Sequence, residues 1–163
     1  MNLQIAADGQ SGPTAARAEV AETSAGCQLA NALVTFWLGT NRIPDGDAWF
    51  SRLLAPPGEV DATRDLSLHD HGYLVFWGGE HDRAAERFRE SLDLAASLDD
   101  ASLQALALAG LARVALYTDA SEAVRLLRKA IELTRDLPPA ELDHARAEGA
   151  AMSREQAVAY ALT

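Results

Sequence analysis

The sequence has little cysteine, little lysine and no long apolar run. Each of these shortages argues against a class of proteins. A single cysteine, Cys27, cannot form an internal disulfide, which predicts a reducing, cytoplasmic environment. Lys129 is the only lysine, and 14 Lys and Arg against 24 Asp and Glu give a formal net charge of −10. Since such a surface repels phosphate groups, we expect no direct binding to nucleic acid. Neither a membrane-spanning apolar run nor a signal-peptide pattern occurs, so we expect no membrane association.

Alanine and leucine are abundant in the 163 residues, and this composition favours an all-α fold. The length suits a single domain with a useful core. Residues 1–15 are polar and rich in turn-forming residues, so we predict a flexible N-terminal tail. We assign residues 16–137 to a helical repeat domain and residues 138–163 to a C-terminal helical segment that packs on the repeats.

The clearest pattern spans residues 68–99 and predicts two helices joined by a tight turn. One face of the first helix carries Leu68, Gly72, Val75 and Phe76. The second helix carries a stripe formed by Ala84, Phe88, Ser91, Leu92 and Ala95. Gly78 and Gly79 separate the two helices, because glycine reaches turn conformations that other residues avoid. The small residues Gly72 and Ala84 would let the helices approach each other closely.

This hairpin recurs along the chain at intervals of 38 and 39 residues, with Gly46, Ala84 and Ala123 in register. Later positions repeat too, namely Phe50, Phe88 and Leu127, then Leu53, Ser91 and Ala130, then Leu54, Leu92 and Ile131. The pair Phe36-Trp37 recurs as Phe76-Trp77, and Gly72 recurs as Gly110. Such a unit buries its apolar face only against its neighbours. We therefore predict a right-handed stack of about three helix-turn-helix hairpins plus a C-terminal helix.

The first hairpin is predicted from its apolar residues. Its long helix should turn inward Leu29, Leu33, Phe36 and Trp37. The short helix that follows should turn inward Trp49, Phe50, Leu53 and Leu54, before the prolines of residues 55–58 end it. Capping-box patterns at residues 119–122 and 153–156 predict that two later helices begin there.

The spacing of Gly72, Ala84, Phe88 and Leu92, with the loop GGEHDRA, resembles tetratricopeptide repeats. A closer resemblance is to the helical-repeat region of large actinobacterial LuxR-family and related ATP-binding transcriptional regulators. It is carried by ANALVTFWLGTNRIPDGDAWFSRLLA, by HGYLVFWGGEHDRAAERFRESLDLAASLDD and by RAEGAAMSREQAVAYAL, over roughly residues 28–162. The chain has no G-x-x-x-x-G-K-[ST] motif and stops at Thr163, so we carry over neither the ATPase nor the DNA-binding activity. The resemblance then implies an interaction or sensing module.

The sequence offers no convincing catalytic or metal centre, and we expect neither an enzyme nor a cofactor. His69 and His71 would point about 200 degrees apart on a helix, so they could not share one metal ion. The pair Glu86 and Glu90 sits on a solvated helix face rather than in a dry cleft. Cys27 lies among small residues and is expected to pack rather than react.

The resemblance to tetratricopeptide folds implies a groove lined by the first helix of each unit. Mapping from the two glycines predicts groove positions at Leu66, His69, Tyr73 and Phe76, and at Gln104, Leu111 and Val114. An apolar groove exposed to water is unfavourable, at about 25 cal/mol per Å². The possible occupants are the C-terminal helix of residues 153–162, a second copy of the chain, a partner protein or a small apolar ligand. We therefore expect a non-catalytic protein-interaction module, with a small-molecule sensor as the alternative.

Overall fold

The computed structural model describes residues 13–55 and 60–135, with side chains from residue 21 onwards. All regular structure in these ranges is helical, as the composition predicts. The helices are α1 (Pro13–Gly39), α2 (Ile43–Leu54), α3 (Ala62–Trp77), α4 (His81–Ser97), α5 (Ala101–Ala115) and α6 (Ala120–Thr134).

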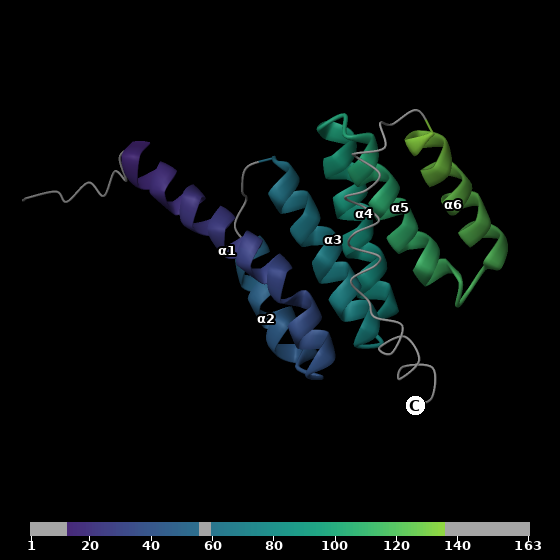
Figure 1. Ribbon diagram of the computed structural model, residues 1–163, viewed down its shortest axis with the longest axis horizontal. Helices are drawn as coiled ribbons and strands as arrows, with labels where there is room; N and C mark the ends of the chain where they lie inside the picture. The colour runs from purple at the N-terminus through teal and green to yellow at the C-terminus, as the bar shows by residue number, and fades with distance from the viewer. Residues whose placement is uncertain (1–12, 56–59, 136–163) are drawn as a thin grey trace, which may run out of the picture.

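The helices form three consecutive hairpins, α1–α2, α3–α4 and α5–α6, which lie side by side (Figure 1). Each hairpin also packs on the next, through contacts of α2 with α3 and of α4 with α5. The first helices of successive hairpins touch as well, because α3 contacts both α1 and α5. The predicted all-α arrangement of hairpins is thus confirmed, whereas its right-handed superhelical twist stays a prediction.

Three of the helices have an aspartate as their N-cap residue. Asp61, Asp100 and Asp119 accept hydrogen bonds from backbone N–H groups in the first turns of α3, α5 and α6. In α6, the expected capping box is half formed. Asp119 accepts from the backbone of Ser121 and Glu122, but the Glu122 carboxylate pairs with Arg125.

The turn between α3 and α4 forms at the predicted glycines. α3 ends at Trp77, and Gly78 is its C-cap. Gly79 has a φ of +84°, a conformation that a side chain would strain. This turn fixes the angle at which α4 returns along α3.

The ring of Phe88 in α4 fills the space between two glycines of neighbouring helices. A Cβ atom at Gly72 of α3 would lie 3.0 Å from Phe88 Cδ1, and one at Gly110 of α5 would lie 2.5 Å from Phe88 Cε1. Gly46 is just as confined, because its Cβ would lie 2.6 Å from Leu74 Cδ2. Ala84 and Ala123, its counterparts in the repeat, are fully buried. The predicted small positions are therefore the places where the helices come closest.

The predicted inward faces of the first hairpin are partly wrong. In α1 the buried residues are Cys27, Ala30, Val34 and Trp37. Leu29 and Phe36 point outward and are 55% and 47% exposed. In α2 Phe50 and Leu54 are buried as expected, whereas Trp49 is half exposed. The reason is that α1 meets its neighbours through small residues. A Cβ at Gly26, for instance, would lie 2.7 Å from Leu53.

The Phe-Trp pairs do not play equivalent roles. In the first pair Trp37 is buried and packs edge-on against Phe50, with ring centres 5.9 Å apart. In the second pair Phe76 is the buried member and Trp77 is partly exposed. In the third hairpin, Leu127 and Ile131 were predicted to face inward, but they are exposed, and Leu126 takes the buried place.

Several predictions lie outside the described residues. These are the N-terminal tail up to residue 12, the prolines within residues 56–58 that were predicted to end the short helix, and the C-terminal segment 138–163 with its capping box. Residues 13–15, which we assigned to the tail, belong to α1 instead. Within the described ranges, no helix combines the length and apolar character needed to cross a membrane.

Candidate functional site

The helix α3 carries a row of rings on the side that faces α5. His69, Tyr73 and Trp77 follow each other at intervals of four residues, which stacks them along one helix face. The rings of His69 and Tyr73 are nearly parallel, with centres 6.5 Å apart, and Tyr73 meets Trp77 edge-on at 6.1 Å. His69 is almost buried, whereas Tyr73 and Trp77 remain partly exposed.

A cation from α5 lies on this row. The guanidinium carbon of Arg113 sits 4.8 Å from the centre of the Tyr73 ring and 5.9 Å from that of Phe76. Leu111 and Val114, on the same helix, pack against the cluster that contains Phe76 and Phe88. We call the partly exposed residues of this region the α3–α5 face, which consists of Tyr73, Trp77, Leu111, Arg113 and Val114.

The row continues into the turns at one end of the hairpins. Phe76 stacks on His81 at the start of α4, with ring centres 5.1 Å apart. The ring of Tyr117, just after α5, meets His81 at 4.6 Å and Phe76 at 5.8 Å. These contacts join the ends of α3, α4 and α5, so the backbone beneath the α3–α5 face is held in place.

The structure brings together most, though not all, of the predicted groove residues. Tyr73, Phe76, Leu111 and Val114 belong to one cluster, and His69 lies beside it. Phe76, however, is only 4% exposed and His69 only 8%, so these two side chains pack the interior rather than offer a surface. Leu66 and Gln104 are partly buried and lie on earlier turns of α3 and α5.

Sequence reasoning missed Arg113 and Trp77 at this face. Trp77 was noted only as a member of the repeated Phe-Trp pair, and Arg113 was not singled out. The four-residue spacing from Tyr73 to Trp77 was a signal that could have found the tryptophan. For Arg113 the signal was its place between Leu111 and Val114, two of the predicted groove residues.

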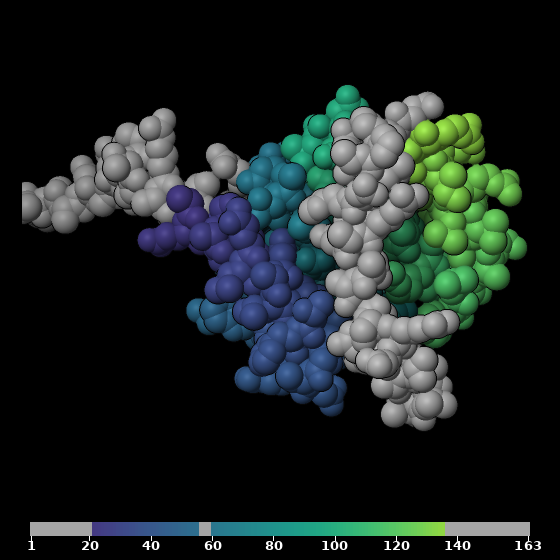
Figure 2. All heavy atoms as spheres, in the orientation of Figure 1, coloured from purple at the N-terminus to yellow at the C-terminus, as the bar shows by residue number. Residues whose placement is uncertain are grey.

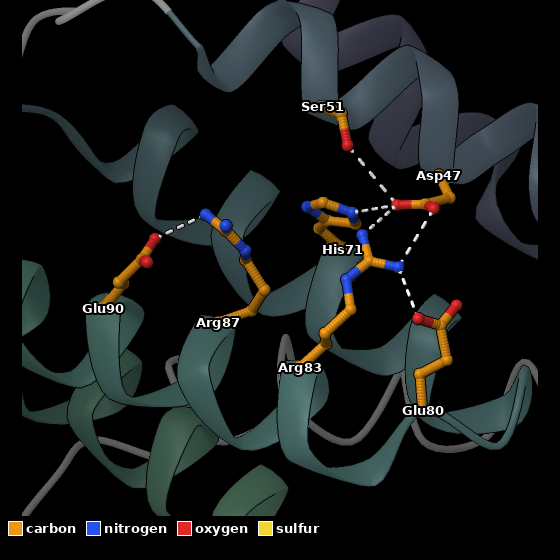
Figure 3. A network of polar contacts seen from close by, with 7 residues as sticks. All are labelled: Asp47, Ser51, His71, Glu80, Arg83, Arg87 and Glu90. Atoms are coloured by element: carbon orange, nitrogen blue, oxygen red, sulfur yellow. Dashed lines mark hydrogen bonds and ion pairs between the residues drawn. The ribbon is translucent and has the colours of Figure 1, made fainter.

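On the side of α3 that faces α2, charged residues form a polar network (Figure 3). Nε2 of His71 lies 2.7 Å from Oδ1 of Asp47, and Arg83 of α4 binds both oxygens of Asp47, at 2.8 and 3.2 Å. Arg83 also binds Glu80 at 2.6 Å, and the Ser51 hydroxyl donates to Asp47 at 3.4 Å. The network therefore ties α2, α3 and α4 together through one carboxylate.

The environment of this network shifts the pKa values of its members, and those of His71 and Asp47 both fall. Burial lowers the pKa of His71, which the nearby Asp47 carboxylate only partly offsets. For Asp47, burial raises the pKa, but the hydrogen bonds from Arg83 and His71 outweigh it, so the pKa falls below its ordinary value. His71 is also stacked on Phe50, with ring centres 5.5 Å apart. A neutral imidazole that donates to a charged carboxylate fits these surroundings.

A fully buried carboxylate, that of Asp65, lies between α3 and α4. Asp65 is fully buried, and Ser91 donates to its Oδ1 at 3.0 Å. Its other oxygen, Oδ2, has no hydrogen-bond partner in the described part of the chain. Burial raises the pKa of Asp65 to about 6, although the Ser91 hydrogen bond opposes that change. Nearby, Ser67 donates to Asn31 at 3.0 Å and so links α3 to α1.

The histidines do not converge. His69 contacts Asp70 and Tyr73, His71 binds Asp47, and His81 stacks on Phe76. In residues 13–55 and 60–135, no group of three or more His, Cys, Asp or Glu side chains is placed to hold a metal ion. His71 and Asp65 of α3 thus join this helix to α2 and α4, whereas the α3–α5 face combines rings, a cation and exposure.

Comparison with known proteins adds no family to this description, because no family model matches the chain and no curated protein is significantly similar to it.

Proposed function

We propose that this protein is a non-catalytic interaction module, like the sensor repeat region of LuxR-type regulators, which binds a segment of another protein on its α3–α5 face. The observation that carries the proposal is the partly exposed pair Tyr73 and Trp77 next to Arg113. Tyr, Trp and Arg are the residues most enriched at the energetic centres of protein interfaces.

The charge of the face suggests the chemistry of the partner. The chain as a whole carries a net charge of −10, yet the cation at the centre of this face, Arg113, forms no ion pair with a described carboxylate. Its guanidinium is held over the Tyr73 ring and keeps donors for an incoming acceptor. A segment with an apolar side chain for the tyrosine and tryptophan and a carboxylate for Arg113 would match the face.

Rigidity also favours this use. The backbone under Tyr73 and Arg113 belongs to helices α3 and α5, which pack on each other and on α4. The ring contacts among Phe76, His81 and Tyr117 hold the helix ends. A preformed surface loses little conformational entropy when it binds, so a modest contact area suffices for measurable affinity.

The experiment selects peptides that bind the full chain from a random displayed library and measures their Kd by fluorescence anisotropy. We expect Tyr73→Ala and Arg113→Gln each to weaken binding about tenfold or more, as loss of an interface centre does. Trp49→Ala is the matched control, since it removes a half-exposed aromatic side chain from α2. Phe76→Ala is unsuitable, because it would open a cavity in the core.

Two results would overturn the proposal. One is that the selected peptides bind Tyr73→Ala and Arg113→Gln as tightly as the unchanged chain. The other is that no peptide is selected while a metabolite from a thermal-shift panel raises the Tm of the unchanged chain and not of Tyr73→Ala. The second result would favour the small-molecule sensor.

A further inference from the structure

The helix α6 exposes an apolar stripe at one edge of the molecule. Val124, Leu127 and Ile131 follow each other at helical spacing and are 55%, 41% and 64% exposed. Figures 1 and 2 show α6 at the opposite edge of the stack from α1. The buried side of α6 is different, because Ala123, Leu126 and Ala130 pack against α5.

The preceding hairpin shows what normally covers such a stripe. The counterparts of the three residues, 39 positions earlier in α4, are Ala85, Phe88 and Leu92. Ala85 and Phe88 are buried, and Leu92 is partly buried. Phe88 is covered by α5, the first helix of the following hairpin, at the point where that helix has Gly110. The same holds one layer earlier, where Phe50 of α2 is stacked against His71 of α3, next to Gly72. The exposed side chain of Leu127 therefore faces the position that the first helix of a fourth hairpin would occupy.

The sequence after α6 contains a segment of the right length and pattern. Gly110 follows Gly72 by 38 residues, and Gly149 follows Gly110 by 39. In residues 140–155, apolar or small residues occur at helical spacing, at Leu142, Ala145, Gly149 and Met152. A helix over this range would be about as long as α5, which has 15 residues.

The charges of α6 and of residues 140–155 also favour contact between these two segments. Arg128 lies beside the exposed stripe, and no described carboxylate pairs with it. The segment 140–155 carries an excess of acidic residues, with Glu141, Asp143, Glu148 and Glu155 against Arg146 and Arg154. A second copy of α6 would instead bring together two helices with an excess of cations, and such surfaces are less complementary than surfaces of opposite charge.

From this register we propose that residues 140–155 bind the exposed stripe of α6 as the first helix of a fourth layer, with Gly149 over Leu127. The segment then covers the edge of the stack and leaves the α3–α5 face free for a partner. The inference does not depend on the proposed function, because it concerns the opposite side of α5.

The test measures how fast an introduced thiol reacts with N-ethylmaleimide in the full chain, after Cys27→Ala has removed the native thiol. Leu127→Cys reports on the stripe. Lys129→Cys, on the exposed opposite side of α6, is the matched control. We expect Leu127→Cys to react at least about tenfold more slowly than Lys129→Cys, and at a rate that does not change with protein concentration.

A second pair of variants identifies the segment. Gly149→Leu places a large side chain where the helices should touch, so it should raise the reaction rate of Leu127→Cys towards that of Lys129→Cys. Ala147→Leu, on the other side of the segment, should leave the rate unchanged. Circular dichroism confirms that each variant is folded.

The outcomes are distinguishable. Equal rates for Leu127→Cys and Lys129→Cys would overturn the proposal, since the stripe would then be open in the isolated chain. Protection that grows with protein concentration, with a dimer in light scattering, would assign the stripe to a second copy. Protection that survives Gly149→Leu would overturn the assigned register.

Discussion

The imidazole of His71 lies 2.7 Å from Asp47 through Nε2, while its other nitrogen, Nδ1, is buried without a hydrogen-bond partner among the described residues. A neutral ring with its proton on Nε2 satisfies this geometry. A second proton would have to sit on Nδ1, where no described acceptor lies close. Burial of the ring thus makes this histidine resistant to protonation and lowers the pKa of His71, although the Asp47 carboxylate opposes that effect.

The first prediction concerns acid stability. Because the folded state holds the pKa of His71 below 6.5, the unfolded chain takes up a proton first as the pH falls. The stability linked to His71 is therefore complete above about pH 6.5 and is lost as the pH falls through the folded pKa. His71→Gln keeps a donor for Asp47 and does not titrate, so it should cost about 1 kcal/mol at pH 7.5 and less at pH 5. Urea unfolding at the two pH values measures the difference. A constant difference would show that His71 charges normally in the folded protein.

The second prediction concerns Asp65, whose effect has the opposite sign. Its pKa in the folded protein is about 6, above the ordinary value of 3.8, so the buried charge destabilises the protein above pH 6. Asp65→Asn should therefore raise the free energy of unfolding at pH 8 by about 1–3 kcal/mol. The gain should shrink as the pH falls from 6 to 4. Asp93→Asn, at an exposed site of α4, is the control and should have little effect at either pH. Destabilisation by Asp65→Asn at pH 8 would contradict the expected effect of burial.

The third prediction tests the close approach of helices around Phe88. Gly110→Ala should destabilise the protein by about 1–3 kcal/mol, because the new methyl group overlaps the Phe88 ring. Gly72→Ala should cost less, since its Cβ would lie 3.0 Å from the ring. Gly39→Ala meets no atom within 4 Å and should be neutral or slightly stabilising, by up to about 1 kcal/mol. Thermal or urea unfolding of the three variants measures this order. A stabilising Gly110→Ala would show that the ring moves aside freely.

The fourth prediction concerns the start of α6. Asp119 accepts two backbone hydrogen bonds there, at 2.9 and 3.2 Å. Asp119→Ala should lower the free energy of unfolding by about 1 kcal/mol, as the loss of an N-cap does. Ser121→Ala changes an exposed residue of the same turn and should have a much smaller effect. The two variants are compared by urea unfolding, and equal effects would rule out the cap as the cause.

Much of the fold followed from periodicity and helix-ending residues. The aspartate at 119 and the glycines at 78 and 79 placed helix boundaries within a residue or two. These signals are local, because a cap or a turn depends on a few neighbouring residues. The repeat of small positions was informative for another reason. A glycine such as Gly72 tells where two helices must touch, whichever residue lies opposite.

The inward faces of the end hairpins could not be predicted in the same way. Helix α1 has apolar residues around much of its surface, so periodicity alone did not separate Val34, which is buried, from Phe36, which is exposed. In α6 the repeat register placed Leu127 inward, but the side that covers its counterpart Phe88 in α4 is exposed in α6 within the described residues. At the candidate site, the sequence located Tyr73 and missed Arg113. The position of a cation over a ring depends on how α5 lies against α3, which no spacing along one helix reveals.

Within the described residues, the extensive helix contacts lie inside one hairpin or between two consecutive hairpins, with α3 reaching both α1 and α5. Folding such a chain closes only short loops, so rapid folding is expected for its size. In the ranges that the structure describes, the row of hairpins also has no geometric closure of the kind that fixes the strand number of a barrel. A whole hairpin could therefore be gained or lost between related genes without disturbing the remainder, and the length of the array becomes a variable on which selection can act.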